Sequence, residues 1–295
     1  MSSILTNSVD EIRKITADWK KEGLKIGLVP TMGALHKGHE SLIKKAAETC
    51  DKIIVSIFVN PIQFGPNEDY DKYPRTIDSD KKICYANNVN IIFSPSVTEM
   101  YGNELKSGGS INNNNFTFVC PPYNYTDTLC GKSRIGHFDG VATVVLKLFN
   151  IVQPDFAFFG QKDAQQLIII EKMVRDLNIP IKIIPCPIVR DSDGLALSSR
   201  NKYLSEESRT KALTISKSLK TIQELFFKGI NDPEILFDSS IGVLDKSIEL
   251  EYLEFVDLYS LEKTDIINKK TLVAIAAKVD NVRLIDNIII GENNC

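Results

Sequence analysis

The chain has 295 residues, 43% of them apolar, and its 35 basic against 38 acidic side chains give a net charge of −3. This length and apolar content can bury a sizeable core in one large domain or two, while the balanced charge argues against nucleic acid as a partner. The N-terminus lacks a secretory signal pattern and no apolar run reaches membrane-spanning length, so we expect a cytoplasmic protein with small-molecule ligands and no membrane partner.

The N-terminal part predicts a β–α–β unit. Ser8 and Glu11 form a capping-box pattern in front of apolar residues at helical spacing, which predicts an amphipathic helix. A continuous Ile/Val/Phe run further on is typical of a parallel strand that is covered on both faces. The expected elements are a helix over Val9–Lys21, a strand over Lys25–Val29, a helix over Glu40–Thr49 and a strand over Lys52–Val59.

A loop with two histidines connects the first expected strand to the next helix. It reads Pro30-Thr31-Met32-Gly33-Ala34-Leu35-His36-Lys37-Gly38-His39. Its glycines allow close approach to a ligand, and N–H groups at a helix start favour phosphate. The chain has three histidines, and imidazole stabilises charge on phosphate or transfers protons near neutral pH. We therefore predict that His36 and His39 are catalytic. The alternative is a helix cap and a buried structural histidine.

Amides follow the second expected strand. In open parallel sheets ligands bind beyond the carboxyl ends of strands, so Asn60 and Gln63 are placed to meet one. Amides donate and accept hydrogen bonds, which suits a substrate with hydroxyls and a carboxylate. A simple Asn-Pro turn is the alternative. Arg75 follows in a polar, aromatic loop, where it serves either a phosphate or a surface salt bridge.

The middle of the chain loses its periodicity. We expect a helix over Asp78–Asn87, a strand over Asn90–Phe93, and then an Asn/Gly/Ser-rich loop from Gly102 to Asp127 that leaves room for a short strand at Phe116–Val119. An apolar helix over Val141–Phe149 follows. Before it, His137 is either a third base or, as we favour, a structural residue of its turn, and Arg134 is expected at the surface or at a subunit contact.

A second polar cluster follows an apolar strand at Phe156–Phe159. It comprises Gly160-Gln161-Lys162-Asp163-Ala164-Gln165-Gln166 and opens a helix. Lys162 offers an ammonium group to a phosphate, Asp163 a carboxylate to a ribose hydroxyl, and Gln166 lies one helical turn further. A solvated helix start is the alternative interpretation.

A third polar cluster follows the strand expected over Ile181–Val189. Ser198, Ser199 and Arg200 combine short donors with a forked cation, a set that suits phosphate oxygens, although a helix cap with a surface arginine is equally compatible. The remaining chain predicts a small α+β unit, with helices over Glu206–Phe227 and Pro233–Glu251 and strands over Leu253–Leu258, Leu272–Ala277 and Arg283–Ile289. Six scattered cysteines without metal-ligand spacing predict reduced thiols and no protein-built metal site.

The loop at residues 30–39 resembles the H-x-G-H signature of nucleotidylyltransferases, and its longer string resembles the pantothenate synthetase (pantoate–β-alanine ligase) family. The segments Phe58–Phe64, Phe159–Gln166, Ser198–Arg200 and Arg283–Asn287 are similar to the same family, so the resemblance covers nearly the whole chain except 103–127. It implies an α/β fold: a Rossmann-like doubly wound parallel sheet over residues 1–188, with a smaller C-terminal α+β lid domain over 189–295.

The resemblance also implies a reaction. Pantoate would attack the α-phosphate of Mg-ATP to give pantoyl adenylate and pyrophosphate, and β-alanine would then displace AMP to give pantothenate. His39, His36 and Lys162 would be catalytic, and Asn60, Gln63 and Gln166 would bind pantoate. Mg²⁺ would be held mostly by ATP, with Asp80 as a candidate ligand, in a homodimer. ATP would be bound by Met32, Gly33, Ala34, Leu35, His36, Lys37, Gly38, His39, Gly160, Gln161, Lys162, Asp163, Val189, Leu197, Ser198, Ser199 and Arg200.

Two alternatives remain open at this point. Another H-x-G-H nucleotidylyltransferase, such as a pantetheine-phosphate adenylyltransferase, would release a stable nucleotide-linked product rather than AMP. A non-catalytic nucleotide sensor on the same fold would bind ATP without releasing pyrophosphate.

Overall fold

The computed structural model describes residues 3–66, 68–103, 116–268 and 270–291. By its internal contacts the chain divides into two compact units. The first unit comprises Met1–Pro122, Arg134–Gln161 and Ile169–Pro187, and the second comprises Tyr123–Ser133, Lys162–Ile168 and Ile188–Cys295. Two short segments of the N-terminal part therefore belong to the second unit.

The first unit is built on a six-stranded parallel sheet in the order β1-β4-β3-β2-β5-β6. The uninterrupted apolar runs of β2 and β3 suit this position, because both faces of an inner parallel strand are covered. The strands are β1 (Ile4–Thr6), β2 (Ile26–Thr31), β3 (Lys52–Ile57), β4 (Ile91–Phe93), β5 (Phe156–Gly160) and β6 (Lys182–Cys186).

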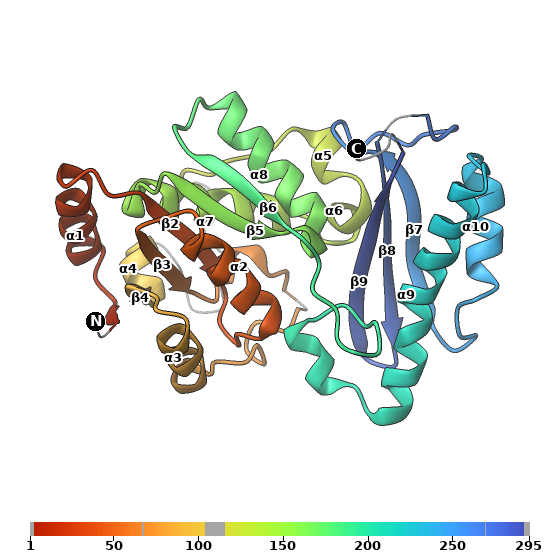
Figure 1. Cartoon of the computed structure of the whole chain (residues 1–295), viewed down its shortest axis with the longest axis horizontal. Helices are drawn as coiled ribbons and strands as arrows, with labels where there is room; N and C mark the ends of the chain where they lie inside the picture. The colour runs from red at the N-terminus through yellow and green to blue at the C-terminus, as the bar shows by residue number, and fades with distance from the viewer. Residues whose placement is uncertain (1–2, 67, 104–115, 269, 292–295) are drawn as a thin grey trace. The chain divides into compact units, whose positions relative to one another are not determined.

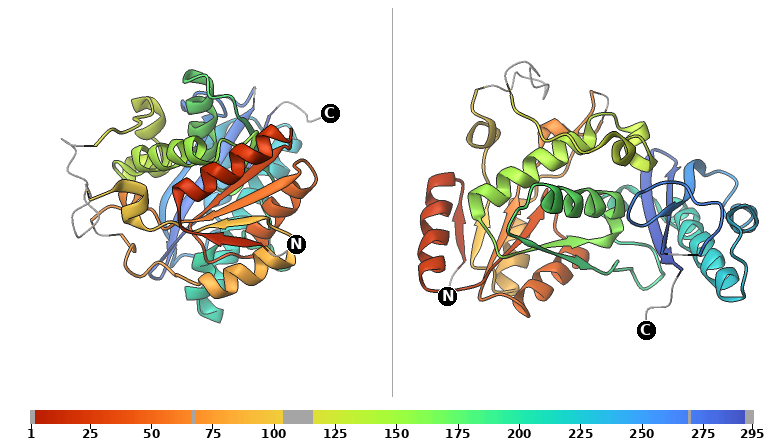
Figure 2. Two further views of the ribbon diagram at one scale, coloured as in Figure 1. Left: turned by 90° about the vertical axis from the view of Figure 1, so that its left-hand side faces the viewer. Right: turned by 90° about the horizontal axis from the view of Figure 1, so that it is seen from above.

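Helices lie on both faces of this sheet (Figures 1 and 2). Helices α1 and α7 contact each other on one face, and α2 and α3 lie on the other. Right-handed crossovers require this arrangement, since the chain moves along the sheet in opposite directions after β2 and after β5. The helices of this part are α1 (Val9–Lys21), α2 (Lys37–Ala47), α3 (Ile77–Ala86), α4 (Val97–Tyr101) and α7 (His137–Val152), with the short 3-10 helix η1 (Pro61–Gln63).

Local sequence signals explain most of these elements. Ser8 is the N-cap of α1, and its hydroxyl accepts a hydrogen bond from the N–H of Glu11, as the capping pattern predicts. The expectation of a strand at Phe116–Val119 is wrong, since this segment is irregular. Strand β1 escaped prediction because three residues at a sheet edge carry no measurable period. Part of the Asn-rich loop, residues 104–115, lies outside the described residues.

The second unit contains a three-stranded antiparallel sheet in the order β7-β8-β9. Its strands are β7 (Glu249–Asp257), β8 (Thr271–Val279) and β9 (Val282–Ile290), and its longer helices are α9 (Glu206–Phe227) and α10 (Pro233–Ile241). Its short helices are α5 (Tyr123–Thr126), α6 (Leu129–Ser133) and η3 (Ser199–Tyr203). Helix α8 (Ala164–Asp176) begins in this unit, directly after the 3-10 turn η2 (Gln161–Asp163).

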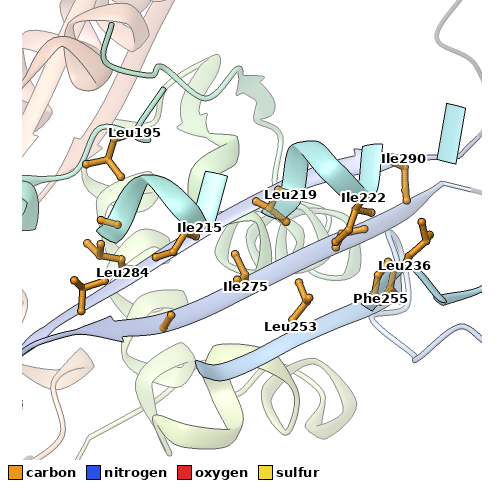
Figure 3. Packing of buried hydrophobic residues seen from close by; sticks show 14 of the residues in the cluster. Leu195, Ile215, Leu219, Ile222, Leu236, Leu253, Phe255, Ile275, Leu284 and Ile290 are labelled. Carbon is orange, nitrogen blue, oxygen red and sulfur yellow. The ribbon is translucent and has the colours of Figure 1, made fainter. Parts of the chain in front are cut away.

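One face of this sheet forms the core of the second unit with α9 and α10. Figure 3 shows Ile215, Leu219 and Ile222 of α9 directed at Ile275 of β8 and its neighbours. The expected helix over Pro233–Glu251 is wrong in its last part, because α10 ends at Ile241 and Glu249 already begins β7. The register of β7 shifts between residues 250 and 252, and such a bulge interrupts the alternation by which a strand is predicted.

The predicted fold class is confirmed: a doubly wound parallel sheet is followed by a smaller α+β unit. Among the described residues, no helix is both long and apolar enough to cross a bilayer. Five cysteines within the described ranges carry free thiols, namely Cys50, Cys84, Cys120, Cys130 and Cys186, while Cys295 lies outside those ranges.

Candidate active site

The loop after β2 begins where the strand order of the sheet reverses. Strands β2 and β5 are neighbours, and the chain leaves them toward opposite edges of the sheet. Ligands of open α/β sheets bind outside the carboxyl ends of the strands at such a point. The loop that carries both predicted catalytic histidines therefore starts from the expected place.

A buried carboxylate fixes the backbone of this loop. Gly33 and Ala34 have left-handed backbone angles, with φ of 83° and 50°, which are strained for a residue with a side chain. Asp80 of α3 is 1% exposed and accepts hydrogen bonds from the N–H groups of Ala34 at 3.1 Å and Leu35 at 2.8 Å. The hydroxyl of Thr76 also donates to it. Asp80 thus holds the loop, and its role as a candidate metal ligand stays a prediction.

The two histidines cap α2. His36 is the N-cap, and its Nδ1 accepts a hydrogen bond from the N–H of Gly38 at 3.1 Å, while Nδ1 of His39 accepts from the N–H of His36 at 3.3 Å. Their ring centroids are 4.2 Å apart. Because both Nδ1 atoms accept, the neutral rings carry their proton on Nε2. The cap that we considered as an alternative to a catalytic role is present, and it orients both imidazoles.

The amides after β3 lie next to this loop. Nδ2 of Asn60 donates to Oε1 of Gln63 at 3.0 Å, and Nε2 of Gln63 is 3.1 Å from the sulfur of Met32. Tyr101 donates its hydroxyl to Oδ1 of Asn60 at 2.7 Å, and Asn60 also donates to the carbonyl of Gly140 at 3.1 Å. The structure therefore brings Gln63 to the histidine loop, with Asn60 orienting it.

Close backbone packing fixes the segment that carries Gln63. A Cβ on Gly140 of α7 would lie 2.4 Å from the carbonyl oxygen of Ile62 and 2.7 Å from Cα of Gln63. Only glycine permits this approach. Sequence analysis gave no role to Gly140 or to Tyr101.

His137 also holds the Gln63 segment. Its Nδ1 lies 2.7 Å from the carbonyl oxygen of Gln63, so this nitrogen donates, and its Nε2 accepts from Arg134 at 2.9 Å. Arg134 makes a bidentate pair with Glu68 at 2.7 and 2.6 Å. This geometry matches the structural role that we favoured for His137. The side chain of Arg134 is 18% exposed, so it lies only partly at the surface, and the subunit contact that we considered for it stays a prediction.

The charged side chains of Glu68 and Arg75 both have hydrogen-bond partners in the structure. Burial raises the pKa of Glu68, but the hydrogen bond and charge of Arg134 outweigh it and lower the pKa below its ordinary value of 4.5. Arg75 donates to the carbonyls of Tyr70, Asp71 and Tyr73. It therefore stabilises its own loop, and the phosphate and salt-bridge roles that we considered stay predictions.

In the second unit, Lys162 and its neighbours are fixed through the start of α8. The carbonyl of Lys162 accepts a hydrogen bond from Nδ2 of Asn287 at 2.9 Å. Gln165 is 5% exposed; its Nε2 donates to the carbonyls of Tyr125 and Thr128, and its Oε1 accepts from the N–H of Cys130. Of the two adjacent glutamines, Gln165 is thus the buried anchor, and Gln166 stays our candidate for contact with substrate.

The serine–arginine cluster follows a short hairpin in the second unit. Arg190 and Ala196 form an antiparallel bridge, and the N–H of Leu197 donates to the carbonyl of Val189 at 3.0 Å. Ser198 then caps η3 by accepting from the N–H of Arg200 at 3.2 Å. The expected cap is present, and it fixes the segment that carries all three candidate phosphate ligands.

The structure places the predicted residues in two groups. In the first unit, the histidine loop, Asn60 and Gln63 come together. In the second unit, Lys162 and the segment before Ser198 are both attached to β9. Among the described residues, no three histidine, cysteine, aspartate or glutamate side chains are grouped as a metal site would require.

Comparisons with known proteins give a consistent result. A family model described as pantoate-beta-alanine ligase matches residues 4–289. The pantothenate synthetases of Clostridium novyi (strain NT) and Caldicellulosiruptor bescii are 50% and 48% identical to this chain, and each match covers 97% of the chain and 99% of the relative. The family model and both relatives therefore match nearly the whole chain.

Solved structures show the same similarity. The pantothenate synthetase of Thermus thermophilus superposes with a TM-score of 0.87 at 36% identity, covering 97% of this chain and 98% of that one. A pantoate-beta-alanine ligase from Francisella tularensis, complexed with beta-gamma ATP and beta-alanine, gives a TM-score of 0.78 at 36% identity, with 97% of each chain covered.

Proposed function

Because the chain belongs to the pantoate-beta-alanine ligase family, we propose which of its residues carry out each step of the reaction of that family. The protein is an enzyme of pantothenate biosynthesis that joins pantoate to β-alanine. In the route that we propose, a carboxylate oxygen of pantoate attacks the α-phosphorus of ATP, and the bond from that phosphorus to the bridging oxygen breaks to release pyrophosphate. The amine of β-alanine then attacks the acyl carbon of pantoyl adenylate, and AMP leaves.

His36 and His39 stabilise charge on the α-phosphate in this proposal. Their capping geometry carries the assignment, because both Nδ1 atoms accept from the backbone and the Nε2–H donors are thereby set on the opposite edges of the rings. Donors held in place before the reaction stabilise developing charge without reorganisation. The strained loop, fixed by Asp80, supports the same assignment.

Gln63 binds pantoate, with Asn60 keeping its amide in position. Both groups are buried, so a hydroxyl or carboxylate of the substrate that pairs with Gln63 is discriminated by hydrogen bonding. Gln166 is our second candidate for this substrate.

The polyphosphate of ATP is bound by four side chains, those of Lys162, Ser198, Ser199 and Arg200. Their ammonium group, two hydroxyls and guanidinium group match its charge and its oxygens. The remaining ATP ligands in the proposal are Met32, Gly33, Ala34, Leu35, Lys37, Gly38, Gly160, Gln161, Asp163, Val189 and Leu197. Mg²⁺ enters with ATP and is held mainly by its phosphate oxygens. We further propose a cytoplasmic homodimer in which residues 189–295 act as a lid domain that excludes water from the adenylate.

The experiment compares the parent enzyme with His39→Asn, which keeps a side-chain acceptor for the N–H of His36. Pyrophosphate and AMP are measured with pantoate and β-alanine omitted in turn. We expect pyrophosphate release to need pantoate, AMP release to need both substrates, and His39→Asn to lower the rate of pyrophosphate release by about 10²–10³-fold.

Retained pyrophosphate release in His39→Asn would contradict the role of this histidine. A stable nucleotide-linked product without AMP would indicate another nucleotidylyltransferase. Binding of ATP without pyrophosphate release under any of these conditions would indicate a sensor.

A further inference from the structure

Strand β9 carries two adjacent buried polar side chains, Asp286 and Asn287. They are 5% and 4% exposed in a sheet whose β8 strand is almost entirely apolar. A buried polar group costs free energy unless it is hydrogen-bonded. The partners of these two side chains therefore indicate what the strand holds in place.

Asn287 holds the segment of Lys162. Its Nδ2 donates to the carbonyl oxygen of Lys162 at 2.9 Å across 125 positions of sequence. Leu284 and Ile290 of β9 belong to the core on the α9 side, so Asn287 lies on the opposite face by strand alternation. Its register partner on β8 is Ala274, a small residue that leaves room for the approaching backbone.

Asp286 holds the hairpin that leads to Ser198. Its carboxylate makes a bidentate pair with Arg190 at 2.6 and 2.9 Å, and the carboxylate side chain is 4% exposed. The side chain of Arg190 also donates to the carbonyl of Gly194 at 3.2 Å. The backbone of Arg190 pairs with that of Ala196 in an antiparallel β-bridge. Such a charge-assisted fork fixes orientation as well as distance.

One strand thus anchors both polyphosphate-binding segments of the second unit. Successive residues of a strand point to opposite faces, so Asp286 and Asn287 reach two different segments from neighbouring positions. Hydrogen bonds along the whole length of β9 tie it to β8. The spacing between the two segments is therefore set by a strand that cannot easily move.

We propose that Asp286 and Asn287 are positioning residues that set the spacing between Lys162 and the segment Ser198–Arg200. The proposal rests on the function proposed above, in which these groups bind ATP. Asn287 acts through Lys162 on the adenylation rate, and Asp286 acts through the Arg190 hairpin on the affinity for ATP. Neither residue needs to touch a substrate.

The test separates the two half-reactions. Pantoate-dependent exchange of pyrophosphate into ATP reports adenylate formation, and aminolysis of supplied pantoyl adenylate by β-alanine reports the second step. Asn287→Asp has the same shape but no donor for the Lys162 carbonyl, and Asn287→Ala removes the side chain without adding charge. We expect both variants to lower the exchange kcat about 10–100-fold, because small misplacements of a catalytic group have effects of this size. Aminolysis should stay within about twofold, since it requires no transfer at the polyphosphate.

Asp286→Asn tests the other anchor. Loss of the bidentate pair should raise the KM for ATP about tenfold while the KM for pantoate stays within about twofold. The matched control is Asp257→Asn on β7, a buried carboxylate that accepts from the N–H groups of Tyr259 and Ser260 in a turn. Asparagine keeps an oxygen that can accept both hydrogen bonds, so this control should leave both half-reactions within about twofold of the parent enzyme.

Several outcomes would overturn the proposal. The proposal is refuted if both Asn287 variants keep an exchange rate within about twofold of the parent enzyme. It is also refuted if the rates of both half-reactions fall equally, because that result indicates a structural role alone. An unchanged KM for ATP in Asp286→Asn would refute the second anchor. If Asn287→Asp does not fold, Asn287→Ala decides by the same criteria. If the parent enzyme shows no pantoate-dependent exchange, the proposed function itself is refuted. A negative result in the variants alone refutes only the positioning role of Asp286 and Asn287.

Discussion

Replacement of Asp80 by alanine should destabilise the first unit and displace the histidine loop. The carboxylate is 1% exposed and accepts from the N–H groups of Ala34 and Leu35 and from the hydroxyl of Thr76. In Asp80→Ala the buried N–H of Leu35 and the partly buried N–H of Ala34 lose their partner, at about 1–3 kcal/mol each. The free energy of unfolding should therefore fall by about 2–6 kcal/mol, the sum for two such groups.

The activity should fall as well. Ala34 keeps its left-handed backbone angle only while surrounding contacts fix it, whereas Gly33 adopts such an angle without strain. Without the carboxylate the loop relaxes, and the imidazoles of His36 and His39 leave their places. We expect kcat to fall at least about tenfold under conditions in which the variant remains folded.

Urea unfolding followed by tryptophan fluorescence measures the stability. The chain has one tryptophan, Trp19 of α1, so this signal reports the first unit. Asp78→Ala is the matched control, because Asp78 lies on the same helix with an exposed side chain that pairs with Lys81. Its unfolding midpoint should change much less than that of Asp80→Ala, because an exposed pair in the first turn of a helix contributes at most about 1 kcal/mol.

An unchanged midpoint in Asp80→Ala would refute this reasoning. If the variant instead kept its stability and required more Mg²⁺ for activity, Asp80 would be a metal ligand, the candidate role that we gave it from the sequence.

Two further predictions concern the Gln63 segment. Gly140→Ala places a methyl group 2.4 Å from the carbonyl oxygen of Ile62, so it should raise the KM for pantoate and destabilise by about 1–3 kcal/mol; steady-state kinetics check this, and an unchanged KM would contradict it. Arg134→Met removes the partner that lowers the pKa of Glu68. Because that pKa is lower in the folded state, the ionised pair stabilises above the unfolded value and its contribution is lost as the pH falls through the lowered pKa. The difference in urea midpoint between parent and variant should be present at about pH 7 and shrink toward about pH 3; a difference independent of pH would exclude this role of the pair.

Local patterns determined much of the fold. Ser8 and the apolar spacing after it predicted α1 with both its ends, and α9 over Glu206–Phe227 was predicted equally well. Such signals depend on neighbours a few residues apart, and the sequence contains those neighbours directly. The bulged start of β7 was mistaken for helix because its pairing is decided by another strand.

Of the candidate site, too, one part could be predicted from the sequence and another part could not. The histidines, Gln63, Lys162 and Arg200 could be selected from the sequence because chemistry and glycine-containing context point to them. Asp80 could have been noticed as a carboxylate on the apolar face of its helix, three residues after Ile77 and four before Cys84.

What the sequence by itself determined is the class of fold, the order of its segments and the chemical groups offered to substrates. Only the tertiary structure decided which residues hold those groups. Asp80 meets Leu35 across 45 positions, and Asn287 meets Lys162 across 125. A buried polar side chain must find a partner wherever the packed chain provides one, and no local rule of spacing encodes a partner so distant.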